Sequence, residues 1–128
     1  MSALHESSLV HHNGTSAGEV ADLLSNHAAL VTEGEDGSYT VFFKEPFEEL
    51  PPRKRVATAL FLQRVRAELE SESAWLTPSE LTQWLDLPMG VVYPALRHLE
   101  RQSVVENRNG LYRIPGTEFS KLKRVLRE

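Results

Sequence analysis

The spacing of apolar residues divides the chain into helical and extended segments. Residues 52–72 carry the longest helical pattern, and Pro51 and Pro52 stand at its start, where proline is well tolerated. Between Val56 and Leu62, apolar side chains cover most sides of the pattern. A surface helix would show a single apolar stripe. We therefore expect this helix to be enclosed between other elements of the fold.

The N-terminal half contains two smaller elements. Residues 15–27 have the pattern of a short helix, with Thr15 or Ser16 as its N-cap and Glu19 in its first turn. Residues 28–43 form two strand-like runs around a Gly-Glu-Asp-Gly turn, which predicts a β-hairpin. A helix and one hairpin are too small to bury a core alone, so we expect this half to pack on the rest of the chain.

A short extended segment and a helix open the C-terminal half. Trp75 and Leu76 have the character of a short strand. Thr77 and Glu80 then have the spacing of a capping box, which predicts that a helix begins here. Pro88 cannot continue that helix, so we expect a break before the next one.

The next helical pattern carries a narrow apolar stripe. Val92, Leu96 and Leu99 fall on one side of it, which predicts that this side faces the core. Because proline is tolerated in the first turn of a helix, Pro94 predicts that the regular helix begins near residues 91–93.

A second hairpin and a last helix complete the chain. Residues 104–107 and 111–114 flank Asn109-Gly110, a sequence typical of tight hairpin turns. The last helical pattern has four apolar residues on one side: Phe119, Leu122, Val125 and Leu126. A helix this short is not stable alone in water, so we expect its apolar face to be buried in a two-fold dimer or against the chain's own core.

The order of these elements predicts an α+β fold of the winged helix-turn-helix type. In residues 51–128, the second and third helices form the helix-turn-helix, and the hairpin after them forms the wing. Residues 15–50 are an N-terminal extension made of a helix and a β-hairpin. Residues 1–14 are polar and aperiodic, and we expect them to be a disordered tail.

Charge is divided unequally between the two halves. The chain has a net charge of −4. Residues 1–52 hold one base and nine acids, a net charge of −8, whereas residues 53–128 hold 13 bases and nine acids, a net charge of +4. The change of sign falls at Pro51 and Pro52, which makes this the best candidate for a domain boundary.

The basic half carries its candidate DNA-binding groups where a winged helix meets DNA. Arginine is the commonest bidentate partner of guanine in the major groove, and a wing can reach phosphates or the minor groove. The candidates are Tyr93, Arg97, His98 and Arg101 on the third helix, and Asn107, Arg108, Asn109 and Arg113 on the wing. The alternative for Arg97 and Arg101 is a solvated helix face on which they pair with Glu100 or with acids elsewhere. The alternatives for His98 and Tyr93 are a surface residue without a function and a side chain packed under the wing.

Residues 90–105, GVVYPALRHLERQSVV, resemble the recognition helix of the PadR-like winged-helix regulators. That family's pattern is similar to G-x-L-Y-P-x-L-x-x-L-E. The residues that match it are Gly90, Tyr93, Pro94, Leu96, Leu99 and Glu100. The resemblance implies a transcriptional regulator that binds double-stranded DNA and is usually a homodimer.

Two further features bear on function. Arg53, Lys54 and Arg55 form either a phosphate clamp or a solvated basic cluster at the domain joint, and we favour the cluster. Trp75 and Trp84 are expected in the core. The sequence contains no nucleophile–base pair, phosphate-binding glycine loop or metal-ligand spacing, so we expect neither enzymatic activity nor a cofactor or metal.

Localisation and a second function follow from the remaining observations. The chain has no cysteine and no apolar run long enough to cross a membrane, so we expect a cytoplasmic protein without a membrane partner.

Winged helices also act as scaffolds in larger assemblies. The alternative function is therefore a protein-interaction module whose acidic N-terminal half binds a protein partner.

Overall fold

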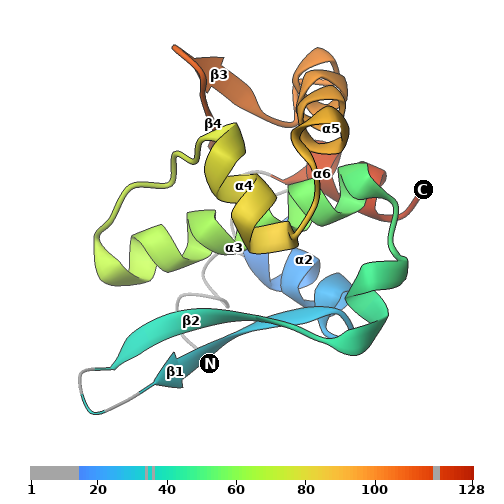
Figure 1. Ribbon diagram of the computed structural model, residues 1–128. Helices are drawn as coiled ribbons and strands as arrows, with labels where there is room; N and C mark the ends of the chain where they lie inside the picture. Colours follow the sequence, from blue (N-terminus) through green and yellow to red (C-terminus); the bar gives the residue numbers. More distant parts are fainter. Residues whose placement is uncertain (1–14, 34, 36, 117–118) are drawn as a thin grey trace.

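The computed structural model describes residues 15–33, 35, 37–116 and 119–128, and over these ranges the chain has an α+β fold (Figure 1). The tail expected for residues 1–14 lies outside the described residues. In chain order, the elements are α2 (Ala17–Leu24), β1 (Ala28–Glu33), β2 (Ser38–Phe43), the 3-10 helix η1 (Glu45–Glu49), α3 (Pro52–Glu70), α4 (Pro78–Leu85), α5 (Met89–Arg101), β3 (Glu106–Arg108), β4 (Leu111–Arg113) and α6 (Ser120–Leu126).

Helix α3 lies at the centre of the molecule, as its apolar sides predict. Figure 1 shows α2 and the β1–β2 hairpin on one side of it and α4 and α5 on the other. One hydrophobic core contains buried residues from both halves of the chain, including Val20 and Phe47 before α3 and Leu81 and Leu96 after it. The acidic half therefore packs on the basic half through α3.

Two helix starts match their sequence signals. Ser16 caps α2, and Thr77 caps α4; in each, the glutamate three residues later completes a capping box. Helix α5 differs from expectation because it begins at Met89 rather than near residues 91–93. Pro94 consequently lies in its second turn, where it has no N–H to donate to the carbonyl of Gly90. The remaining hydrogen bonds and the buried stripe maintain the helix across this position.

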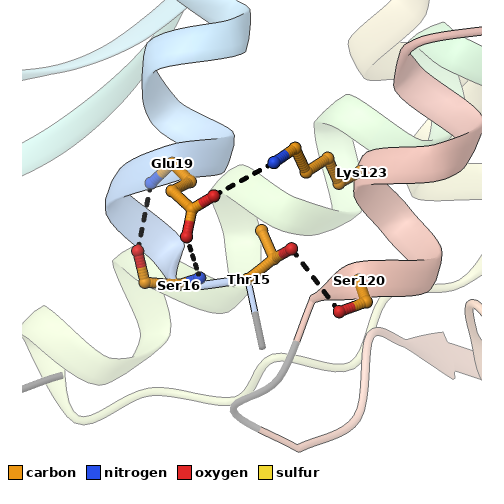
Figure 2. Close-up of polar contacts among 5 residues, drawn as sticks. All are labelled: Thr15, Ser16, Glu19, Ser120 and Lys123. Atoms are coloured by element: carbon orange, nitrogen blue, oxygen red, sulfur yellow. Dashed lines mark hydrogen bonds and ion pairs between the residues drawn. The ribbon is translucent and has the colours of Figure 1, made fainter. Parts of the chain in front are cut away.

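The two ends of the described chain meet (Figure 2). The backbone N–H of Phe119 donates to the carbonyl of Thr15 at 3.0 Å, and the Lys123 ammonium lies 3.1 Å from the carboxylate of Glu19. Below these contacts, Leu122 and Val125 of α6 are buried in the shared core. The apolar face of α6 therefore closes the chain's own core, and the dimer interface expected from this face is not available there.

Neither tryptophan lies fully in the core, contrary to expectation. Trp84 is half-buried and packs against the core with the Arg66 guanidinium 5.1 Å from the centre of its ring. Trp75 is also half-buried, next to Leu76, which forms a single antiparallel bridge with Tyr112 in place of a strand.

None of the helices within the described ranges has both the length and the apolarity needed to cross a bilayer.

Candidate nucleic-acid interface

Helix α5 has one buried face and one exposed face. Val92, Leu96 and Leu99 are fully buried, as their spacing predicts. Residues four apart lie on the same side of a helix, and here Tyr93, Arg97 and Arg101 form the exposed row. Of the residues expected on this surface, His98 is half-buried beside the row.

The two arginines of this row are not neutralised. Neither Arg97 nor Arg101 forms an ion pair with any residue that the structure describes. The Arg97 guanidinium lies 5.8 Å from the centre of the Tyr93 ring, a cation–π contact that holds it on the exposed face. The face therefore presents two unpaired cations from a helix that is anchored in the core.

Four carboxylates lie on the elements around this face: Glu80, Asp86, Glu100 and Glu106. Glu80 accepts the backbone N–H of Thr77 at 2.8 Å within the capping box, and Glu106 forms an ion pair with Arg113. Two of the four are thus engaged within the chain, which reduces their influence on the exposed arginines.

The β3–β4 hairpin turns through Asn109 and Gly110. Both have positive φ angles, 55° and 85°, the geometry of a type I′ turn. The Asn107 side chain stabilises this turn because its Oδ1 accepts the Gly110 N–H at 3.0 Å and its Nδ2 donates to the Tyr112 hydroxyl at 3.3 Å. Asn107 and Asn109 therefore shape the turn, and Arg108 is the exposed cation next to it.

One face of this hairpin carries a cluster that the sequence analysis did not identify. Trp75, Glu106 and Arg113 are cross-strand neighbours, since Leu76 bridges Tyr112 and Glu106 pairs with Arg113. The guanidinium carbons of Arg113 and Arg108 lie 4.4 Å and 5.3 Å from the centre of the Trp75 ring. The signal available in the sequence was the position of Trp75 next to an expected strand, opposite the basic hairpin.

The other face of the hairpin contacts α5 through Tyr112. This side chain is only 1% exposed, and its hydroxyl interacts with both Asn107 and Tyr93. Burial raises the pKa of Tyr112, the nearby Tyr93 and Glu100 raise it further, and Arg97 opposes them. The phenol therefore remains neutral and links the hairpin to α5. Tyr93 contacts Tyr112 of the hairpin and is itself 43% exposed.

The basic cluster at the start of α3 is used within the chain. Arg53 forms an ion pair with Glu128 at 2.9 Å, and Lys54 donates to the backbone carbonyl of the same residue. The Arg55 Nε donates to the carbonyl of Leu50 at 2.8 Å. These contacts favour the interpretation as a basic cluster at the joint over a phosphate clamp.

An open hollow of about 380 Å³ lies beside the exposed row of α5, lined by Thr77, Pro78, Ser79, Met89 and Tyr93. Figure 1 shows α5 and the β3–β4 hairpin on the side of α3 opposite the β1–β2 hairpin. In the part of the chain that the structure describes, no group of His, Asp and Glu side chains is arranged to hold a metal ion.

Comparison with known proteins does not assign the chain to a family. It matches no protein-family model, and neither a curated protein nor a solved structure is significantly similar to it.

Proposed function

We propose that this protein is a DNA-binding transcriptional regulator with a winged helix-turn-helix fold. In this proposal α4 and α5 are the helix-turn-helix, α5 enters the major groove, and the β3–β4 hairpin is the wing. The observation that carries the proposal is the row of Arg97 and Arg101, two unpaired cations on the exposed face of a helix whose opposite face is buried.

The electrostatic arrangement supports a polyanionic partner. Arg53 and Arg113 form ion pairs within the chain, whereas Arg97, Arg101 and Arg108 form no ion pair with a described residue. Unpaired arginines that project from one surface are suited to contact phosphates and base edges. Within the acidic residues 1–52, α2 and the β1–β2 hairpin lie on the side of α3 opposite this surface (Figure 1).

A titration of labelled random-sequence duplex at two salt concentrations tests the proposal. We expect a dissociation constant at low salt in the micromolar range or tighter, of the order typical for non-specific binding, and a steep loss of affinity as salt rises because phosphate contacts release counterions. Absence of binding at low salt with excess protein would contradict the proposal. That result would favour the alternative of a winged-helix scaffold whose acidic half binds a protein partner.

A further inference from the structure

The exposed face of α5 is not uniformly polar. At its N-terminal end, Met89 is 44% exposed and Tyr93 is 43% exposed. Together with Pro78 at the start of α4, they contribute the apolar wall of the open hollow described above. Solvent-exposed methionine and tyrosine at this position require an explanation other than core packing.

Thr77 and Ser79 also line the hollow, and the hydroxyl of Thr77 is already engaged. The Thr77 hydroxyl accepts the backbone N–H of Glu80 at 3.1 Å and donates to the Glu80 carboxylate at 3.2 Å. Pro78 has no N–H to offer. The apolar atoms of Met89, Tyr93 and Pro78 therefore suit this part of the hollow to a small apolar group.

The position of the hollow indicates what that apolar group is. The Tyr93 ring lines the hollow and also carries the Arg97 guanidinium, so a ligand of Arg97 lies next to the hollow. In helix-turn-helix proteins, residues near the N-terminus of the recognition helix contact base edges. The apolar group that a base presents in the major groove is the C5-methyl group of thymine.

We propose that Met89 and Tyr93 receive the C5-methyl group of a thymine that lies next to the bases contacted by Arg97 and Arg101. This inference rests on the proposed function and adds a sequence preference to it. Burial of one methyl group corresponds to a change of about threefold to fourfold in affinity.

The test removes the methyl group from the DNA and the apolar wall from the protein. A preferred duplex is selected from a random library with the full-length protein, and each thymine in the protected region is replaced in turn by deoxyuridine, which lacks the methyl group. Binding is measured for the parent, for Met89→Ala and for Leu69→Ala. Leu69 is a matched control because it is another exposed apolar helical residue, 53% exposed at the end of α3.

We expect deoxyuridine at one position to weaken binding by about threefold to fourfold for the parent and Leu69→Ala, and Met89→Ala to lose most of that difference. Binding that is indifferent to deoxyuridine at every position overturns the inference but leaves the proposed function standing. A selected site without thymine also overturns the inference alone, and so does a Met89→Ala protein whose binding is still weakened by deoxyuridine as much as that of the parent. A parent protein that binds no duplex overturns the proposed function and this inference together.

Discussion

At the scale of single residues, the exposed arginines differ in what surrounds them. Arg97 lies against the Tyr93 ring, whereas Arg101 forms neither a cation–π contact nor an ion pair with a described residue. Arg113 is held by Glu106 and Trp75 together, and Arg108 by Trp75 alone. A guanidinium that is already positioned loses less side-chain entropy when it binds, so these neighbours affect how each arginine contributes to affinity.

We predict that Arg97→Ala and Arg101→Ala weaken DNA binding without unfolding the protein, because both side chains are exposed. A base contact by either arginine should cost about 1–3 kcal/mol on the preferred site and relax the sequence preference there. A phosphate contact should instead weaken all sequences alike and reduce the salt slope by about one. Titrations at several salt concentrations distinguish the two.

The control for these variants is Lys44→Ala, which removes the single base of residues 1–52. Lys44 directly follows β2, a strand that lies on the side of α3 opposite α5 (Figure 1). The control variant should bind DNA like the parent. If both arginine variants also bind like the parent at every salt concentration, α5 is not the DNA-contacting helix.

We predict that Trp75→Leu weakens DNA binding by about twofold to fivefold, the value of a cation–π contact at an exposed site. The physical reason is that Arg108 loses the ring surface that orients its guanidinium. Trp75→Phe keeps an aromatic face and should lose less affinity, as measured by the same titration. Equal losses for the leucine and phenylalanine variants would show that ring stacking does not contribute.

At the scale of elements, α5 combines two functions on opposite faces. Its buried stripe belongs to the common core, and its exposed row carries the candidate contacts. The turn after β3 is similarly divided, since Asn109 and Gly110 provide the positive φ angles and Arg108 provides the exposed charge. Substitutions on the two faces of one element should therefore have separable effects.

We predict that Leu96→Ala destabilises the protein by about 2–5 kcal/mol through the cavity it leaves, because Leu96 is fully buried. Arg97→Ala, one residue away, should change the free energy of unfolding by no more than about 0.5 kcal/mol. Urea denaturation of both variants measures the difference. Comparable losses of stability would mean that Arg97 is a packing residue rather than a surface contact.

At the scale of the whole molecule, contacts between distant parts of the sequence close the fold. Figure 2 shows Glu19 between Ser16 of its own capping box and Lys123 of α6. The hydrogen bond from Lys123 lowers the pKa of Glu19 most, the backbone hydrogen bond from Ser16 adds to this, and burial acts in the opposite direction. The ionised carboxylate is therefore favoured in the folded state.

We predict that Glu19 stabilises the fold at neutral pH and that this contribution disappears in acid. A carboxylate whose pKa is lowered in the folded state stabilises the protein at pH values above 4.5, the ordinary pKa of the group. This stabilisation is lost as pH falls through the lower pKa of the folded state. Glu19→Gln keeps the capping box but lacks the charge. The difference in unfolding free energy between the parent and this variant should shrink as pH falls below 4.5.

The control for the pH series is Glu72→Gln, an exposed glutamate without an ion pair to any described residue. Its stability should follow that of the parent across the series. A constant difference between the parent and Glu19→Gln at all pH values would show that the Lys123 contact does not depend on the charge.

The sequence by itself determined the elements and much of the candidate surface. Capping boxes, the Asn-Gly turn and the apolar stripe of α5 are local signals, because each depends on residues within a few positions of one another. The same locality explains why Arg97 and Arg101 could be placed on the exposed face from their spacing alone. The start of α5 and the segment at Trp75–Leu76 were exceptions, since α5 begins at Met89 with the N–H groups of Val91 and Val92 bonded to the Pro88 carbonyl, and Leu76 forms only a bridge.

Only the tertiary structure decided how charged and aromatic side chains are paired. It closed the face of α6 on the chain's own core, joined Arg53 to Glu128, and placed Trp75 against the arginines of the β3–β4 hairpin. Each of these contacts joins residues that are more than 30 positions apart in the sequence. No local pattern encodes such a pairing, because it depends on how all the elements pack around α3.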